Sequence, residues 1–386
     1  MNMDKQYYTQ VREENQGIDK KIEEIQKKCI EYLKKYPCIQ RKRVVKEEQY
    51  LLTAMIHYIF GKLSFRRLSD FMAQKHGIVM SDTAWKKQFK KCAGWFLKIA
   101  KEVFSEEVSQ QPNGRTILNY AKVYAIDATE LPQEGKTNTN IRIHTSYSLT
   151  RNCVSETVLS DNHTAEKVSH FSVEKGALYV TDRGYGRTTQ FAALMDAGAD
   201  FIIRITPSHV KLYTDETCNV RVDFASLLKN SSDKCFSRCF WFRTRGKKVY
   251  PLRITVSKIP DERIEAAEKR VRSKAVKSQR KLSENTILFS HWILLASSLP
   301  TAIKGRDLLH VYQLRWQIEL FFKRCKSLLD FHKLRKSSSE YLFAAASDFL
   351  AVVYLVSSLA IQISYFLSFP SLFHSFSLAL HSLFFA

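Results

Sequence analysis

The first third of the chain carries hydrophobic residues at helical spacing. After Ser81 and Asp82, apolar positions from Trp85 to Val103 recur at alternating steps of four and three, which places them along one face of a helix. Ser81 or Asp82 can cap the start of that helix. Similar patterns predict helices over residues 18–36, 47–60 and 64–75. We therefore expect residues 1–118 to form a helical region.

From about residue 120 short apolar runs replace the helical spacing. Two of them, 123–126 and 177–181, lead directly into Asp127 and Asp182. Further strands are expected over residues 141–149, 153–159 and 201–205, and a helix over 188–197. Strands and helices in this order predict an α/β domain.

Residues 206–290 interrupt that order. Strand patterns at 239–243 and 249–256 are followed by a strongly basic, helix-favouring run at 261–281. A strand at 291–297 and a long helix at about 305–329 then resume the α/β pattern.

The C-terminal part is unusual because no Asp, Glu, Lys or Arg follows Asp348. Residues 349–365 fit a buried core helix, and 366–386 form an atypical apolar tail rich in Phe, Leu and Ser. The tail is long enough for a membrane helix, but its serines and Pro370 argue against one. We favour a C-terminus altered by frameshift or truncation of the gene.

The chain is strongly basic. It has 60 Lys and Arg against 38 Asp and Glu, a formal charge of +22, which favours a polyanionic partner and above all nucleic acid. A ribosomal or membrane-surface protein is the alternative. The helical region 1–118 then suggests a DNA-binding domain, against the alternative of a helical bundle that does not touch DNA.

The cysteines and the N-terminus indicate the compartment. The cysteines form no paired C-x-x-C clusters of a zinc site, so they are expected to be buried or free thiols. The N-terminus is charged from Asp4 onward and lacks the apolar core of a signal peptide. We expect a cytoplasmic protein.

The helix predicted at 305–329 gathers charge on one face. At about 100° per residue, Tyr312, Arg315, Glu319, Lys323 and Lys326 fall within an arc of about 80°, with an apolar face opposite. A carboxylate among cations is stable without any ligand, so a surface ion-pair network is one interpretation. A ligand site is the other, and this helix alone favours neither.

The two strand-end aspartates favour the ligand site. Parallel strands that deliver Asp127 and Asp182 to one edge of a sheet create a place for divalent metal. Together with Glu319 they are hard oxygen ligands, suited to Mg²⁺ or Mn²⁺. Two such ions about 4 Å apart can activate the attacking oxygen and stabilise the leaving oxygen of a phosphodiester. The neighbouring cations would then bind phosphates beside the scissile bond.

These residues resemble a known family. Tyr312, Arg315, Glu319 and Lys326 have the spacing of the Y-R-E-K signature of bacterial insertion-sequence transposases with a DDE active site. Asp127 in Ala-Ile-Asp-Ala-Thr and Asp182 in Thr-Asp-Arg-Gly-Tyr resemble the first and second aspartate segments of that family. The resemblance covers residues 45–350, about four-fifths of the chain.

The resemblance implies a fold. The catalytic core would be ribonuclease-H-like, a mixed five-stranded sheet with flanking helices, divided between residues 119–205 and 299–365. A mostly β insertion at 206–298 would separate the second aspartate from the glutamate.

The resemblance also implies an activity. It is metal-dependent cleavage and strand transfer at the ends of an insertion sequence, with Asp127, Asp182 and Glu319 as catalytic metal ligands for two Mg²⁺ or Mn²⁺ ions. The expected partners are terminal inverted repeats and target DNA, bound by a homodimer in the bacterial nucleoid. Alternatives are a catalytically inactive DNA-binding remnant, a related DNA nuclease and an RNA-processing enzyme.

Several side chains receive DNA-binding roles from the same resemblance. Tyr312, Arg315, Lys323 and Lys326 would hold phosphates, with Arg183 and Arg204 as helpers. Trp292 lies where relatives stack a tryptophan on a base flipped out of the duplex, and a core tryptophan is an equal alternative.

Overall fold

A computed structural model describes residues 24, 27–39, 42–59, 63–92, 94–109, 115–131, 141–161 and 163–328 of the chain. The predictions for 349–365 and for the tail lie outside these residues. Among the described helices, none is long and apolar enough to cross a membrane.

The N-terminal region is helical where it is described. Residues 27–35 are followed by α2 (Glu48–Ile59), α3 (Phe65–His76), α4 (Asp82–Lys91) and α5 (Trp95–Ser109). Ser81 caps α4 by accepting a hydrogen bond from the amide of Ala84, as predicted. The single helix expected from Trp85 to Val103 is wrong, because the chain breaks between α4 and α5, where Gly94 adopts a left-handed φ of 80°.

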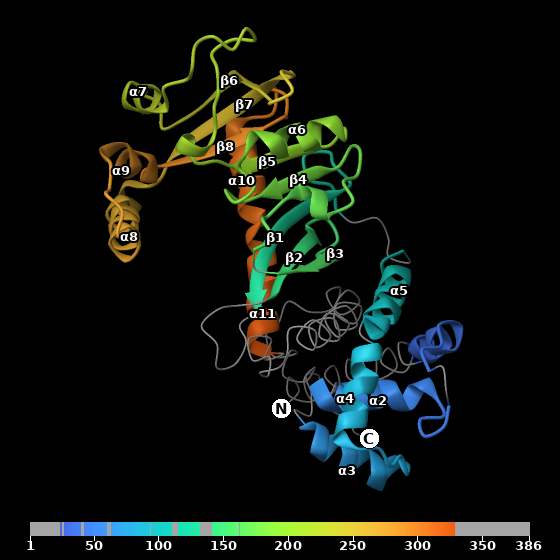
Figure 1. Cartoon of the computed structure of the whole chain (residues 1–386). Helices are drawn as coiled ribbons and strands as arrows, with labels where there is room; N and C mark the ends of the chain where they lie inside the picture. Colours follow the sequence, from blue (N-terminus) through green and yellow to red (C-terminus); the bar gives the residue numbers. More distant parts are fainter. Residues whose placement is uncertain are drawn as a thin grey trace, which may run out of the picture.

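The centre of the molecule is one mixed sheet of eight strands in the order β3-β2-β1-β4-β5-β8-β7-β6 (Figure 1). The strands are β1 (Val123–Leu131), β2 (Ile141–Ser148), β3 (Cys153–Ser160), β4 (Leu178–Thr181), β5 (Asp200–Arg204), β6 (Cys235–Arg243), β7 (Val249–Lys258) and β8 (Trp292–Ser297). The first five strands match the predicted core, and β6 to β8, from the predicted insertion, extend the same sheet to eight strands. Strand β8 pairs antiparallel with β5 and so carries the sheet on into the insertion.

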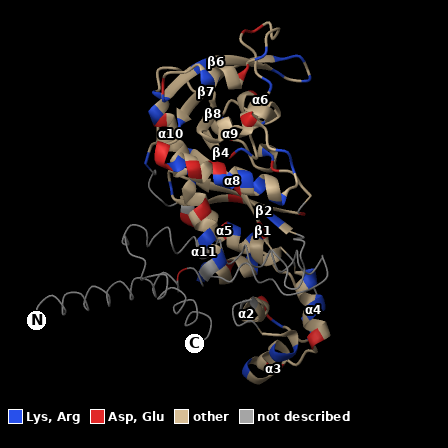
Figure 2. Cartoon of the chain, turned by 90° about the vertical axis from the view of Figure 1, so that its left-hand side faces the viewer, with Lys and Arg blue, Asp and Glu red and all other residues tan. Residues whose placement is uncertain are grey.

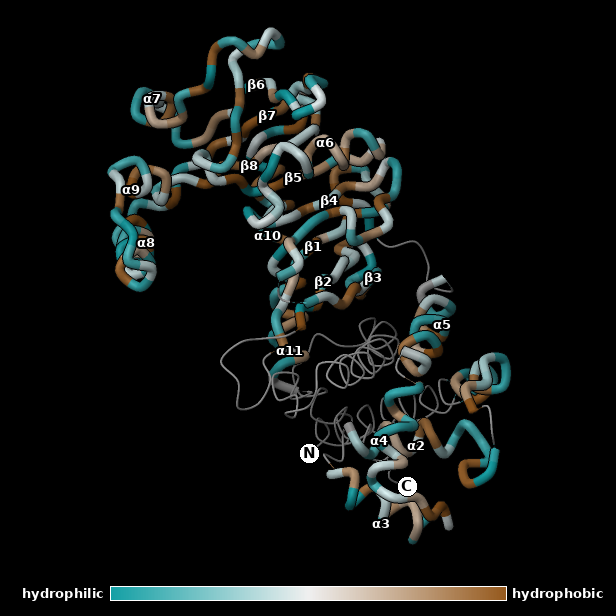
Figure 3. Tube along the Cα trace, viewed as in Figure 1, coloured by the Kyte–Doolittle hydropathy of each residue, from teal (hydrophilic) through white to brown (hydrophobic). Residues whose placement is uncertain are grey.

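Helices cover both faces of the sheet, as the strand order requires. On one face, α6 (Thr188–Asp196) packs Phe191 and Leu194 against Ile126 and Phe201. On the other, α10 (Gly305–Leu314) and α11 (Trp316–Leu328) pack Leu308 and Ile318 against β1 and β4. Figure 3 shows hydrophobic residues along the strands between these layers. The arrangement fits a ribonuclease-H-like core.

The insertion is not mostly β. Besides β6 and β7 it contains α7 (Phe224–Lys229), α8 (Ile264–Lys277) and α9 (Glu284–Ser290). Helix α8 occupies the basic run that the sequence predicted to be helical. The strands β6 to β8 join the core sheet, and the helices α8 and α9 are an excursion between the neighbouring strands β7 and β8. No observation tests the predicted domain boundaries, which stay predictions.

The long helix expected at 305–329 is two helices. Arg315 lies between α10 and α11. Its amide donates a hydrogen bond to Tyr312 O at 3.1 Å, and its carbonyl accepts one from Ile318 N at 3.1 Å. These three-residue spacings tighten the turn, so the side chains before and after Arg315 do not follow one continuous helical arc.

Candidate active site

Asp127, on β1, and Asp182, directly after β4, lie side by side because these two strands are parallel neighbours. The register pairs Ile126 of β1 with Thr181 of β4, and the residue that follows each of them is an aspartate. Each carboxylate accepts a hydrogen bond from nearby backbone. Oδ1 of Asp127 accepts from Ala128 N at 2.8 Å, and Oδ1 of Asp182 accepts from Gly184 N at 2.7 Å. Two apolar strands thus deliver two carboxylates to one place, as their sequence pattern predicted.

Arg315 connects this pair to Glu319. Its Nη1 lies 3.3 Å from Oδ2 of Asp127, and its Nη2 forms an ion pair with Oε1 of Glu319 one turn later. The Arg315 side chain is only 14% exposed, whereas the Glu319 side chain is 43% exposed. The turn that separates α10 from α11 places Arg315 over the end of the sheet, between the carboxylates.

Electrostatics make Asp127 an unusual carboxyl group. Burial raises its pKa from 3.8 to about 6. The hydrogen bond from Ala128 and the positive charge of Arg315 lower the pKa, but the neighbouring carboxylates of Asp182 and Glu166 raise it again. Desolvation and like charge therefore outweigh the one nearby cation. Such perturbed groups are enriched at functional sites.

Glu166 is a further acidic residue of the site that sequence analysis missed. A Cβ atom added at Gly184 would fall on the Glu166 carboxylate and lie 3.0 Å from Oδ1 of Asp182. Burial and the charge of Asp182 raise the pKa of Glu166. No described residue forms an ion pair or a hydrogen bond with its carboxylate. A glutamate in a polar loop has no pattern that would reveal this position.

Tyr185 lies beneath the same group of carboxylates. Its side chain is fully buried, and its hydroxyl has no hydrogen-bond partner among the described residues. Burial raises its pKa, and the charges of Glu166, Asp127 and Asp182 raise it further. A buried hydroxyl without a partner costs free energy, and this one lies within the electrostatic influence of all three carboxylates.

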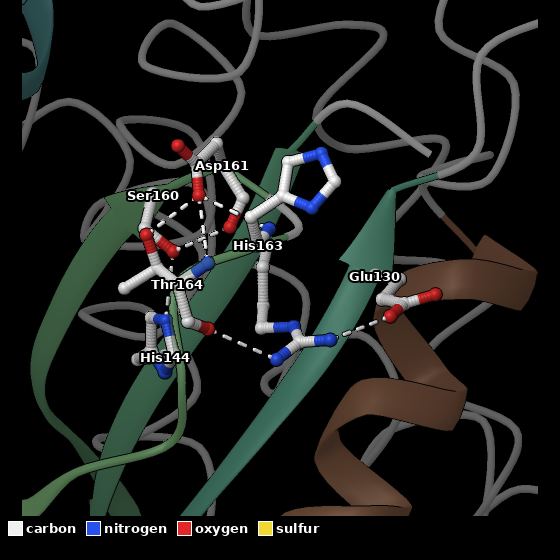
Figure 4. Close-up of polar contacts among 7 residues, drawn as sticks. Glu130, His144, Ser160, Asp161, His163 and Thr164 are labelled. Carbon is white, nitrogen blue, oxygen red and sulfur yellow. Dashed lines mark hydrogen bonds and ion pairs between the residues drawn. The ribbon is translucent and has the colours of Figure 1, made fainter. Parts of the chain in front are cut away.

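The loop that carries Glu166 is fixed by polar contacts (Figure 4). Oδ1 of Asp161 accepts hydrogen bonds from the amide of Thr164 at 2.7 Å and from its hydroxyl at 2.6 Å. Arg142 donates to Thr164 O at 3.1 Å and to Glu130 at 2.8 Å, tying the loop to β1 and β2. The approach of Glu166 to Asp182 is therefore supported by the sheet.

The chemistry of these donors fits a divalent cation. Carboxylate oxygens are the ligands that Mg²⁺ and Mn²⁺ prefer, and an excess of carboxylates at a buried position is what a cation would relieve. As the side chains stand, no three acidic, His or Cys residues of the described ranges converge closely enough to hold one ion. Glu319 is held by Arg315 instead.

The remaining residues with predicted DNA-binding roles differ in how far they are buried. Tyr312 has the Arg315 guanidinium 5.6 Å from the centre of its ring. Lys323 is exposed on α11, and Lys326 is half-buried one turn further on. Arg183 is exposed directly after Asp182, and Arg204 ends β5 half-buried.

Trp292 lies in the hydrophobic core. It is 7% exposed and belongs to the cluster on the α6 face of the sheet. Of the two alternatives left open by the sequence, this placement favours the core tryptophan. Stacking on a base stays a prediction, and the indole would first have to leave this cluster. The exposed tryptophan beside the candidate site is Trp316, at 60% exposure.

Comparison with known proteins identifies the family. The transposase DDE domain family matches residues 121–347, which contain the sheet and every candidate ligand. The chain belongs to this family. It is 27% identical over 310 residues to transposase InsL of insertion sequence element IS186A from Escherichia coli (strain K12), covering 78% of this chain and 82% of that one. The same figures hold for the transposase of insertion sequence element IS421 from Escherichia coli.

The protein is thus an insertion-sequence transposase, an enzyme that cleaves DNA and transfers strands. Members of the DDE family generally use divalent metal ions. A solved structure, the piggyBac transposase synaptic complex with hairpin DNA, aligns with 94% of this chain and 78% of that one at 10% identity and a TM-score of 0.45. A score at that level does not establish a shared fold.

Proposed function

We propose that this transposase moves its element by a cut-and-paste reaction at the site formed by Asp127, Asp182 and Glu319. The observation that carries the proposal is the pairing of the two aspartates on neighbouring strands, with Arg315 joining Asp127 to Glu319. In this reaction water attacks a phosphodiester at the element end and frees a 3′-OH. That hydroxyl attacks the opposite strand to form a hairpin, which is reopened, and the freed 3′-OH then attacks target DNA.

Asp127, Asp182 and Glu319 would hold two Mg²⁺ or Mn²⁺ ions. Bound ions of this kind supply a positive charge for the attacking and leaving oxygens. The residues themselves fix where the reacting phosphate lies. Glu319, the most exposed of the site's ion-paired residues, has to exchange its contact with Arg315 for a place beside the aspartates.

The cations would position DNA. Once Glu319 is released, Nη2 of Arg315 is free for the phosphate next to the scissile bond, while Nη1 stays beside Asp127. Lys323 and Lys326 follow on α11 and, with the Tyr312 hydroxyl, would extend the contact along the DNA strand. Arg183 and Arg204 are proposed helpers at the strand ends.

The proposed partners are terminal inverted repeats and target DNA. The helical region 1–118 would recognise the element end, and a homodimer would join two ends in one complex. Light scattering of the protein with end DNA tests this state. Two protomers and two duplexes are expected, and one protomer per duplex in an actively cleaving complex would contradict it.

The first experiment is strand cleavage on a duplex that carries the element's own flanking ends. Nicking at the end is expected with Mg²⁺ or Mn²⁺, but not with EDTA, and not with Asp127→Ala or Glu319→Gln. Both variants should retain end binding. Metal-dependent nicking that survives Asp127→Ala would refute the assignment of the site, and no nicking by folded wild-type protein bound to its ends would refute the activity.

A further inference from the structure

Helix α8 and the turn that follows it form a separate cationic surface. From Lys269 to Lys281 the chain carries Lys or Arg at seven positions and no acidic residue. All seven side chains are exposed, and no residue of α8 is buried. Figure 2 shows this helix facing the viewer, with Lys and Arg along it. We call residues 263–291, which include α8 and α9, the basic arm.

The basic arm is held firmly at its base. It leaves the sheet after β7 and returns at β8, and these two strands pair as far as Lys258 and Trp292. The amide of Ile259 donates to His291 O at 2.8 Å. His291 Nε2 lies 2.8 Å from Oε1 of Glu268 on α8, which ties the helix to the base. Figure 1 shows α8 and α9 projecting away from the sheet.

Four cations of the arm share one face of α8. Ile264, Ala267, Val271 and Ala275 are half-buried, and α8 and α9 pack together. At about 100° per residue, the cations Lys269, Arg270, Lys274 and Lys277 fall within an arc of about 140° that points away from this stripe.

Partners for these cations are scarce within the protein. Arg272 pairs with Glu268 at 3.4 Å. The other six cations between Lys269 and Lys281 form no ion pair or hydrogen bond with any residue of the described ranges. Like charges one turn apart, as at Arg270 and Lys274, destabilise a helix. A solvated helix face normally mixes both signs, so this face is better matched to a polyanion.

We propose that the exposed face of the basic arm binds the sugar–phosphate backbone of duplex DNA, at a place separate from the phosphates at the cleavage site. The proposal rests on the proposed function, because it takes DNA as the substrate. Regularly spaced phosphates match a row of lysines and arginines, and such contacts carry no base sequence. The arm would therefore fix how the duplex lies on the protein and would leave end recognition to other elements.

The test replaces Lys269, Arg270, Lys274 and Lys277 by Gln in the full-length chain. The matched control replaces Lys211, Lys229, Arg245 and Lys247, which are also exposed and remove the same charge. Circular dichroism should show both proteins folded, because all eight side chains lie on the surface. Affinity is measured for an end-carrying duplex and for a scrambled duplex of equal length, at several KCl concentrations.

The arm variant should lose affinity for both duplexes equally. Each lost phosphate contact lowers the slope of log affinity against log salt by about 0.9, so the slope should fall by about 3 to 4. Between about 50 and 200 mM KCl the wild type should then lose roughly 100-fold more affinity than the arm variant. The control should follow the wild type.

Three outcomes would overturn the proposal. They are an arm variant that binds DNA like the wild type, equal losses in arm and control variants, and a loss confined to the end-carrying duplex. If the wild type cleaves ends and the arm variant binds them unchanged, only the arm proposal fails. A folded wild-type protein that binds no duplex DNA removes both the arm and the proposed function.

Discussion

Replacing Asp127 by Asn should make the metal-free transposase more stable near neutral pH. The pKa of Asp127 is raised from 3.8 to about 6 in the folded chain, so between these values the folded state holds a proton that the unfolded state has released. Stability therefore falls as pH rises through this window. Asparagine carries no charge and escapes that loss.

The size of the effect follows from the two pKa values. The raised pKa of Asp127 lowers the stability of the wild type by about 1 kcal/mol at pH ~4.5, where only the unfolded state is largely ionised, and by about 3 kcal/mol at pH ~7.5, where both states are. Between these two pH values, the difference in free energy of unfolding between Asp127→Asn and wild type should thus change by roughly 2 kcal/mol in favour of the variant. The raised pKa already includes the attraction of Arg315, so the lost ion pair needs no separate correction.

The assay is urea unfolding of both proteins in EDTA at the two pH values, followed by circular dichroism. All other titrating groups are shared, so the difference between the proteins reports the charge at position 127 together with its effect on Asp182 and Glu166. A difference that stays constant, or moves in favour of the wild type as pH rises, would refute the electrostatic account of the site.

Three further predictions concern the same site. Glu319→Gln should abolish end nicking in a cleavage assay while end binding in a gel shift stays within about twofold of wild type, and loss of both would indicate a structural role. Glu166→Gln should weaken Mn²⁺ binding, measured by electron paramagnetic resonance, by about tenfold, whereas Glu216→Gln on an exposed loop should not. Gly186→Ala should lower the free energy of unfolding by about 1–3 kcal/mol because its Cβ would lie 2.8 Å from the backbone oxygen of Arg204, whereas Gly184→Ala should cost less because only the end of the Glu166 side chain has to move; a larger loss for Gly184→Ala in urea unfolding would contradict this.

The position of the two aspartates could be predicted from sequence because it depends on local patterns. Apolar runs of strand length lead into Asp127 and Asp182, and parallel neighbours bring their ends together. The register of Ile126 with Thr181 confirms that geometry. The roles of these carboxylates as ligands stay predictions. The helix cap at Ser81 could be predicted from the sequence for the same reason, because the capping hydrogen bond spans only a few residues.

Features that depend on contacts between residues far apart in the sequence could not be predicted from local patterns. Glu166 reaches Asp182 only through a loop held by Arg142 and Asp161, and no spacing encodes that approach. The sheet extends beyond β5 because β8 pairs with it, a choice made between segments far apart in sequence. The break at Arg315 follows no proline or glycine, so periodicity suggested one helix where packing produces two.

The ion pairs of Arg315 and the raised pKa of Asp127 belong to one arrangement of charges. Asp127, Asp182 and Glu166 share a partly buried corner, and Arg315, which pairs with Asp127, is also engaged by Glu319. Excess negative charge of this kind can be relieved by a proton on Asp127 or by a divalent cation among the carboxylates. The proton and the cation compete for the same carboxylate. Asp127→Asn should therefore be more stable than the wild type in EDTA, but Mn²⁺ should stabilise the variant less than it stabilises the wild type. The carboxylate that weakens the empty fold is thus the group that gives the site its affinity for a cation.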